Sequence, residues 1–269
     1  MSVSRREFLQ VSAAAVAGAE MSLPAQSATS AAASLTAVKA LVFDTFGTVV
    51  DWRSSVAREV AAVAASKGVP LDAARFADAW RAGYGPSMNR VRSGELPWTR
   101  LDALHRMTLD RILVDFKLAG LSEEEKVALN HAWHRLTPWP DAVAGLRRMK
   151  KRFIIAPLSN GNISLMTNLA KHSGLPWDVI LGAELARHYK PDREVYQSAA
   201  DILDLKPADV MMVAAHLGDL RAAKQVGLRT AFVTRPKEYG PAGKPDRKAD
   251  ASVDLSATDF NDLARQLQA

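Results

Sequence analysis

The sequence predicts an α/β fold: a Rossmann-like parallel sheet with helices on both faces and an inserted helical cap subdomain. From Trp139 onward, short apolar runs alternate with helical patterns, which is typical of parallel strands joined by crossover helices. Between the first strand and that alternation, residues 53–136 contain helical patterns and no convincing strand. These observations predict a core formed by residues 38–52 plus 137–269, with a cap formed by residues 53–136.

The first expected strand is "KALVFD", residues 39–44, an apolar run that ends at Asp44. The turn at residues 45–48, with Gly47 inside it, follows directly. A carboxylate at the carboxyl end of a buried strand lies where open α/β sheets place their functional groups. Asp44 is therefore the first candidate catalytic residue.

Four helical patterns make up the predicted cap. The second of them, "DAARFADAWRAGYG", carries Phe76 and Trp80 at helical spacing. The fourth begins with a capping box, in which Ser122 is followed three residues later by Glu125. The four patterns cover residues 54–68, 72–85, 106–120 and 122–136.

The predicted core continues the alternation to the end of the chain. Strands are expected at residues 153–158, 178–182, 210–215 and 229–233. Helices are expected at 141–152, 162–172, 193–203, 219–226 and 258–268, with a Pro/Gly-rich loop at 235–248.

The first residues, 1–33, differ in composition from the rest. Arg5 and Arg6 in "SRREFLQ" are followed by a short apolar stretch and then by small residues. This resembles a bacterial twin-arginine export signal, which implies a periplasmic protein and the export machinery as a partner. The alternative is an Ala-rich tail, favoured by Glu20 close behind the apolar stretch, and then the protein would be cytoplasmic.

Composition excludes several classes of site. The chain has no cysteine, which excludes disulfides, thiolate nucleophiles and Cys-ligated zinc. The net charge is +6, but the Lys and Arg residues are scattered and form no stripe interleaved with aromatic residues. This predicts an anionic small-molecule substrate and no nucleic-acid partner.

Polar residues follow four of the expected strands. After Asp44 come "SNGN" at 159–162, Lys190 in "HYKPD", and then His216 with Asp219. Because the carboxyl ends of parallel strands meet at one edge of the sheet, these groups are expected to share a crevice. Any one of them, Asn162 or Asp219 for example, could instead be a simple helix cap.

The order of motifs D-x-F-G-T, S-N-G-N, Y-K-P-D-x-x-x-Y and the Asp in "AAHLGDLRAAKQVG" resembles the haloacid dehalogenase superfamily. Within it, residues 38–268 are similar to the type II 2-haloacid dehalogenases. The resemblance implies hydrolytic dehalogenation of short 2-haloalkanoic acids to 2-hydroxy acids without a cofactor, and a possible homodimer.

Two apolar residues distinguish this chain from the phosphatases of the superfamily. Those enzymes carry D-x-D, whose second Asp protonates a leaving alkoxide, whereas this chain has Phe46. A departing halide needs no proton, so the acid is dispensable. The acid that helps the phosphatases hold Mg²⁺ would fall at Ala215, so no metal site is expected.

The resemblance assigns four catalytic roles. Asp44 attacks the halogen-bearing carbon and forms an ester, which water then hydrolyses. Arg81, in "AWRAGY", assists departure of the halide, although it could also be an ordinary surface cation. Lys190 orients Asp44 and compensates its charge, and Asp219 helps to polarise the hydrolytic water.

The resemblance also assigns substrate-binding roles. The substrate carboxylate would be held by Ser159 and the backbone amides of Thr45 and Phe46, with Asn160 near the halide. Thr48 would hydrogen-bond nearby, and Tyr196 would line the pocket or simply pack in the core.

The chain departs from the best-known members at 214–219, where they read S-S-N-A-W-D and this chain reads "AAHLGD". His216 could replace the asparagine as a hydrogen-bond partner or take part in water activation. It could also merely cap a strand end. Two other functions stay open: a related hydrolase acting on another electrophile, such as a phosphoryl group, and a non-catalytic exported binding protein.

Overall fold

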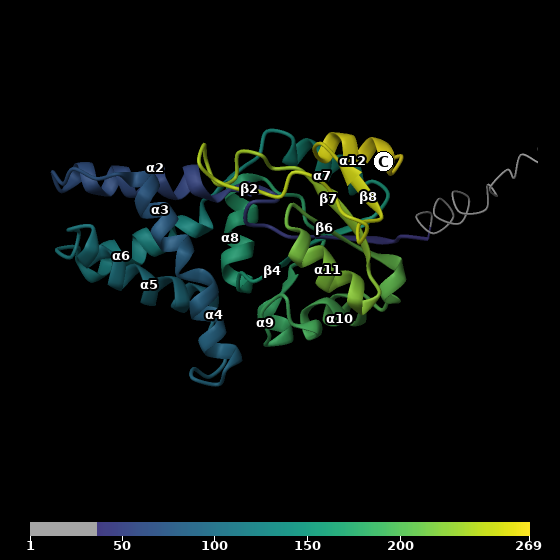
Figure 1. Cartoon of the computed structure of the whole chain (residues 1–269), viewed down its shortest axis with the longest axis horizontal. Helices are drawn as coiled ribbons and strands as arrows, with labels where there is room; N and C mark the ends of the chain where they lie inside the picture. The colour runs from purple at the N-terminus through teal and green to yellow at the C-terminus, as the bar shows by residue number, and fades with distance from the viewer. Residues whose placement is uncertain (1–36) are drawn as a thin grey trace, which may run out of the picture.

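The computed structural model describes residues 37–269, so the predicted leader at 1–33 lies outside the described residues. One sheet of six parallel strands forms the core, in the order β5-β4-β1-β6-β7-β8 (Figure 1). Its strands are β1 (Ala40–Phe43), β4 (Ile154–Ser159), β5 (Leu181–Gly182), β6 (Val210–Ala214), β7 (Arg229–Val233) and β8 (Leu255–Ala257). The predicted α/β fold is confirmed.

Helices cover both faces of this sheet. Apolar residues of α7 (Ala142–Met149), α8 (Ile163–Ser173) and α12 (Phe260–Gln266) pack on one face. Those of α10 (Arg193–Ile202) and α11 (Leu217–Val226) pack on the other, where the short α9 (Ala183–Ala186) also lies. The described chain also contains two 3₁₀ turns, η1 (His131–His134) and η2 (Pro207–Asp209).

The central strand β1 shows why this sheet needs two helical layers. Its residues are all buried, and they alternate between the two hydrophobic clusters: Leu41 and Phe43 enter one, Ala40 and Val42 the other. A strand buried on both sides reads as a continuous apolar run because successive side chains point to opposite faces. Consequently β1 lies between β4 and β6, and Asp44 leaves the sheet at its centre.

The inserted cap lies beside the carboxyl ends of the strands, at the left of Figure 1. It contains α2 (Trp52–Ser66), α3 (Ala73–Ala82), α4 (Tyr84–Arg92), α5 (Leu101–Asp115) and α6 (Glu123–Asn130). The predicted capping box of Ser122 and Glu125 is present at the start of α6. Within residues 37–269 no helix combines the length and apolarity that crossing a bilayer requires.

Several elements differ from the sequence prediction. A two-stranded antiparallel ribbon, β2 (Val50–Asp51) with β3 (Thr137–Pro138), joins the cap to the core, where no strand was expected. Each strand has two residues, which is too short to leave a periodic pattern in the sequence. The two strands are also separated along the chain by the whole cap. β8, which continues the sheet, was missed for the same reason, and β5 is shorter than predicted. The helix α4 was missed because Gly85 and Pro86 suggest a turn, although proline is tolerated in a first helical turn.

A buried ion pair fastens the loop after β7 to the rest of the core. The guanidinium of Arg235, 6% exposed, donates to both carboxylate oxygens of Asp141 at 2.8 Å and 2.8 Å. Its Nε donates to the carbonyl of Thr48 at 2.8 Å, and Asp141 also accepts the backbone amide of Phe260. The pair therefore ties together the turn after β1, the start of α7 and the start of α12.

Removing one member of this pair should destabilise the fold strongly. Asp141→Ala leaves a buried guanidinium without its anion, which costs about 3–5 kcal/mol of unfolding free energy. Chemical denaturation measures this change. As the control, Glu95→Ala removes the partner of Arg90 in an exposed ion pair, and loss of that surface pair should cost within about 1 kcal/mol. Equal effects of the two substitutions would contradict the assignment.

Candidate active site

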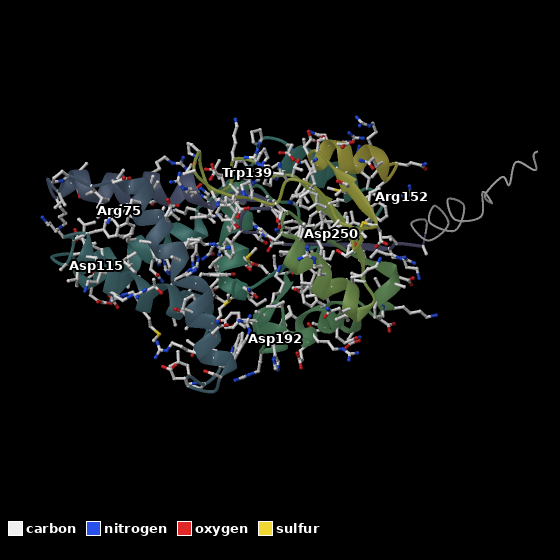
Figure 2. The ribbon with its side chains drawn as sticks, viewed as in Figure 1. Arg75, Asp115, Trp139, Arg152, Asp192 and Asp250 are labelled. Atoms are coloured by element: carbon white, nitrogen blue, oxygen red, sulfur yellow. The ribbon has the colours of Figure 1, made fainter. Side chains whose placement is uncertain are left out.

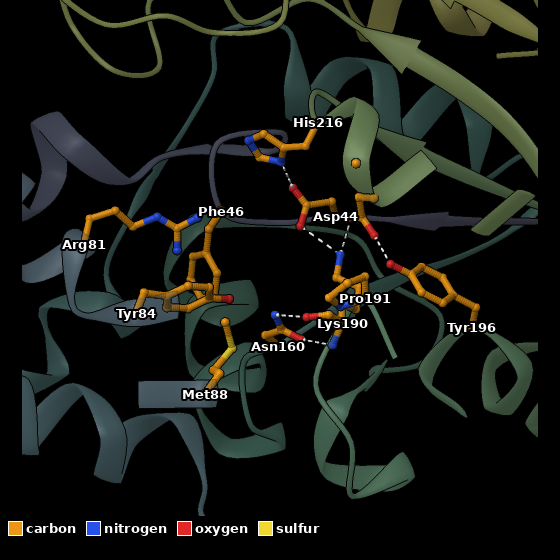
Figure 3. A pocket seen from close by; sticks show the side chains of 12 residues that line it. Asp44, Phe46, Arg81, Tyr84, Met88, Asn160, Lys190, Pro191, Tyr196 and His216 are labelled. Carbon is orange, nitrogen blue, oxygen red and sulfur yellow. Dashed lines mark hydrogen bonds and ion pairs between the residues drawn. The ribbon is translucent and has the colours of Figure 1, made fainter. Parts of the chain in front are cut away.

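A cavity of about 300 Å³ lies between the cap and the carboxyl ends of the strands (Figure 3). The core contributes groups that follow β1, β4, β5 and β6, and the cap contributes residues of α3 and α4. The residues lining the cavity are Asp44, Phe46, Arg81, Tyr84, Met88, Asn160, Lys190, Pro191, Tyr196, His216, Gly218 and Asp219. The four strand ends identified in the sequence do converge.

Asp44 is buried, with 8% of its surface exposed, and its two carboxylate oxygens have different partners. Oδ2 accepts hydrogen bonds from the hydroxyl of Thr48 at 2.7 Å and from Nδ1 of His216 at 3.0 Å. Oδ1 accepts one from Nζ of Lys190 at 3.0 Å. Since each oxygen has two lone pairs, Oδ2 is saturated and Oδ1 keeps one lone pair free.

The charges around Asp44 keep it ionised. Burial alone would raise its pKa, but Lys190 and His216 outweigh burial and hold the pKa well below the usual range of an aspartate. Burial likewise opposes the charge of Lys190, but Asp219 and Asp44 raise the pKa of this ammonium above its usual value. Asp44 is thus an anion, and Lys190 a cation, at any physiological pH.

Lys190 bridges two carboxylates. Its Nζ lies 2.5 Å from Oδ2 of Asp219, whose Oδ1 accepts the hydroxyl of Tyr196 at 2.5 Å. Burial, together with the nearby charge of Asp44, raises the pKa of Asp219 despite Lys190. A carboxyl with a raised pKa beside an ammonium is suited to receive a proton and pass it on.

The cap contacts the loop that carries Lys190. Nε of Arg92, on α4, donates to Oδ1 of Asp192 at 2.9 Å; Asp192 is labelled in Figure 2. Its Nη2 donates to the backbone carbonyls of Tyr189 and Lys190. The loop is therefore positioned by the cap as well as by the core.

His216 lies between two carboxylates. Its Nδ1 faces Asp44, and its Nε2 is 3.0 Å and 2.9 Å from the two carboxylate oxygens of Glu238. Burial would lower its pKa, but the hydrogen bonds to Asp44 and Glu238 raise the pKa to about 10. His216 is consequently an imidazolium that donates from both nitrogens.

Arg81 presents a cation to the cavity. Its guanidinium carbon lies 4.0 Å from the ring centroid of Tyr84 and 5.5 Å from that of Trp52. Among residues 37–269 it forms no ion pair with a carboxylate, and its Nη1 is buried with no acceptor. An unpaired, half-buried cation beside aromatic rings is suited to an incoming anion.

Of the two predicted substrate contacts after β4, Asn160 lines the cavity and Ser159 does not. Asn160 lines the cavity and its amide oxygen accepts the backbone amide of Lys190 at 2.7 Å. Ser159 is fully buried behind it, and its hydroxyl accepts the amide of Gly161 at 3.1 Å. Ser159 therefore supports the turn, and it does not line the cavity.

The turn after β1 also differs in detail from the expectation. The side chain of Phe46 lines the cavity, whereas Thr45 and Thr48 are fully buried and do not. Thr48 connects Asp44 to the amide of Ala215 at 2.9 Å, which fixes the carboxylate relative to β6. In the described part of the chain, the backbone amides of Thr45 and Phe46 donate to no protein acceptor.

Sequence reading missed Glu238 and Tyr84. Glu238 lies in the loop after β7, the fifth strand whose carboxyl end reaches this edge, and reading that strand end would have found it. Tyr84 follows Arg81 by three residues, a spacing that places side chains together along a helical path. Gly47 carries the link to Glu238: its φ is +91°, and a Cβ there would lie 2.0 Å from Oε1 of Glu238.

The donors around Asp44 do not suit a divalent cation. Lys190 and His216, both cationic, lie 3.0 Å from its oxygens, and the side chains of Phe46 and Ala215 offer no ligand atom. Mg²⁺ requires several oxygen ligands in near-octahedral geometry. These side chains therefore do not fit a divalent cation bound beside Asp44.

Comparison with known proteins agrees with this geometry. Residues 38–227 match the model of the haloacid dehalogenase-like hydrolases. The chain is 31% identical to (S)-2-haloacid dehalogenase 4A of Burkholderia cepacia, over 75% of this chain and 87% of that protein.

Two solved structures are similar over almost their whole length. The defluorinating L-2-haloacid dehalogenase Rha0230 is 50% identical, with a TM-score of 0.84 over 86% of this chain and 96% of that one. The L-2-haloacid dehalogenase PA0810 is 47% identical, with a TM-score of 0.81 over 86% and 99%. The chain is a hydrolase that belongs to the haloacid dehalogenase superfamily and, within it, to the L-2-haloacid dehalogenase family.

Proposed function

We propose that this protein hydrolyses short 2-haloalkanoic acids to 2-hydroxy acids through an ester on Asp44. One observation carries the proposal. Asp44 is a permanently ionised carboxylate with a free lone pair on Oδ1, in a small cavity whose cations suit a carboxylate substrate and a departing halide. The relatives described as (S)-2-haloacid dehalogenases support the substrate class.

In the first step, Oδ1 of Asp44 attacks the carbon that bears the halogen. The new O–C bond forms as the C–X bond breaks, and the halide leaves with the electron pair of that bond. Arg81 lines the cavity and has no carboxylate partner within residues 37–269, so it stabilises the anion that develops. The apolar rings of Phe46 and Tyr84 limit competing water in the same cavity.

In the second step, water attacks Cγ of Asp44 and one of its protons passes to Asp219. The Cγ–Oδ1 bond then breaks, and the leaving alkoxide takes a proton from Lys190, which regains one from Asp219. Asp44, now carrying an oxygen from water, releases its remaining proton because its pKa is low. One halide and one proton are produced for each 2-hydroxy acid.

The two alternative functions, a phosphatase and a non-catalytic binding protein, make different demands on the residues around Asp44. A phosphatase of this superfamily would use Mg²⁺ beside Asp44, where Lys190 and His216 repel a cation. A binding protein without catalysis would need no nucleophile, and would keep its ligand affinity without Asp44.

Asp44→Asn should abolish turnover, because an amide oxygen is a weak nucleophile; we expect a loss of about 10⁴-fold or more in halide release. Substrates are L- and D-2-chloropropionate, chloroacetate and, given the defluorinating relative, fluoroacetate. As the control, Asp209→Asn changes an aspartate at the opposite end of β6 and should retain activity.

A single turnover in ¹⁸O-labelled water tests the ester directly. The label should enter Asp44, detected by mass spectrometry of its peptide, and the first 2-hydroxy acid should be unlabelled. Label in the first product instead would mean direct attack by water, and it would overturn the proposal.

Arg81→Lys should lower kcat/KM by about 10²–10³-fold, because a point charge cannot replace the planar guanidinium over Tyr84. The matched control is Arg75→Lys on the same helix, at the far end of the cap in Figure 2. Retention of full activity by Arg81→Lys would remove this residue from the mechanism.

We also propose that residues 1–33 direct export by the twin-arginine pathway, on the evidence of Arg5 and Arg6 followed by an apolar stretch. In a bacterium with this pathway, the full chain should be recovered from the periplasm with a shortened N-terminus. Arg5→Lys combined with Arg6→Lys should leave the precursor in the cytoplasm. Mass spectrometry of the N-terminus distinguishes the two results, and export unaffected by both substitutions would contradict the signal.

A further inference from the structure

We propose that Glu238 is a positioning residue that holds His216 as a permanent hydrogen-bond donor to Oδ2 of Asp44. In this role His216 and Thr48 stabilise the oxyanion that forms on Oδ2 when the Asp44 ester is hydrolysed. The inference deepens the proposed function and rests on it.

The orientation of His216 is fixed from both sides. Nδ1 lies 3.0 Å from Oδ2 of Asp44, and Nε2 lies within 3.0 Å of both oxygens of Glu238. A carboxylate only accepts hydrogen bonds, so both nitrogens must carry protons. The hydroxyl of Tyr239, 3.4 Å from Nε2, is the other polar group that faces the ring.

Glu238 is buried, and its carboxylate is fixed by contacts with Trp52 and Gly47. Its side chain is 1% exposed, and Nε1 of Trp52 donates to its Oε1 at 3.2 Å. It lies against Gly47, where any larger residue would collide with its carboxylate. A buried carboxylate requires a cationic partner, and within residues 37–269 the ion-paired partner of Glu238 is His216.

The two oxygens of Asp44 change roles between the steps. When Oδ1 forms the ester, Oδ2 becomes a neutral carbonyl oxygen that still faces Thr48 and His216. Water then adds to Cγ, the electron pair of the C=O double bond moves to Oδ2, and a full negative charge appears there. When the Cγ–Oδ1 bond breaks, that pair returns and the charge disappears from Oδ2.

Donors on Oδ2 therefore favour the second step over the first. In the first step they face an oxygen whose charge is decreasing, so they do not assist attack. In the second step they face an oxygen whose charge increases from zero to one, and a fixed charged donor is worth most there. Glu238 keeps His216 charged at that moment, when the negative charge of Asp44 has been lost to the ester.

Glu238→Gln tests this assignment while keeping an oxygen for Trp52. Ester hydrolysis should slow by about 10- to 100-fold at pH 9, less than the ~10²–10³-fold loss expected when an oxyanion donor is removed outright. The first-turnover burst of halide should change much less. The Asp44 ester should therefore accumulate in the steady state, measured by mass spectrometry after acid quench.

The pH profile supplies a readout that a merely structural role would not move. In the wild type, hydrolysis should fall as the pH rises through the pKa that His216 has in the ester. The charge of Glu238 holds that pKa above the usual value of a histidine, but it lies below the value of about 10 in the free enzyme, because the esterified Asp44 carries no charge. Loss of the Glu238 charge should shift that fall downward by about 1–3 pH units. Asp102→Asn, which removes the charge from a similar contact with His134 at 3.0 Å in the cap, should leave the pH dependence unchanged.

His216→Asn provides a second variant, because asparagine keeps a neutral donor. In this variant the rate of ester hydrolysis should not decrease at alkaline pH, because asparagine does not titrate. Adding Glu238→Gln to it should lower the rate little further. Nitrogen-15 NMR of the free enzyme reports the ring directly: both nitrogens of His216 should be protonated in the wild type at pH 8, and the pH at which the ring loses its proton should be lower in Glu238→Gln.

The outcomes separate the two proposals. If the wild type releases no halide from any haloacid while NMR shows the doubly protonated His216, the proposed function fails. If the wild type turns over but Glu238→Gln folds with an unchanged pH profile and no accumulated ester, the role of Glu238 is overturned. A neutral His216 in the wild type would overturn it as well.

Discussion

The buried carboxylate of Asp44, held by Lys190 and His216, is the interaction on which the site depends. Removing a charge from water is costly unless it is paired and hydrogen-bonded. Here each oxygen of Asp44 meets a cation at 3.0 Å. The same contacts keep the nucleophile ionised, orient it, and leave one lone pair of Oδ1 for the substrate.

The surrounding charges extend this principle through the cavity. Asp44, Asp219 and Glu238 are matched by Lys190 and His216, which each lie between two carboxylates. The guanidinium of Arg81 comes from the cap and brings a further positive charge into the cavity. A substrate with one carboxylate and a leaving halide complements such a site, and a core without its cap would lack that cation.

The turn after β1 shows how one superfamily fold supports different chemistry. Where a phosphatase needs an acid and a metal, this chain has Phe46 and Ala215, and it places His216 next to the nucleophile instead. An imidazolium can polarise an ester carbonyl but cannot coexist with Mg²⁺ at the same oxygen. In this protein the imidazolium of His216 therefore occupies the place next to the nucleophile that Mg²⁺ takes in the phosphatases.

The sequence by itself determined the sheet, its alternation with helices, the cap and the convergence of Asp44, Lys190 and Asp219. These follow from local periodicity and from the rule that parallel strands end at one edge, which needs no coordinates. It could not determine β2, β3 and β8, whose short strands acquire meaning only from distant partners. Nor could it determine that Ser159 turns inward, or that Glu238 meets His216 and lies against Gly47. Such contacts join residues far apart in the chain, and they depend on ångström-scale packing that no local pattern encodes.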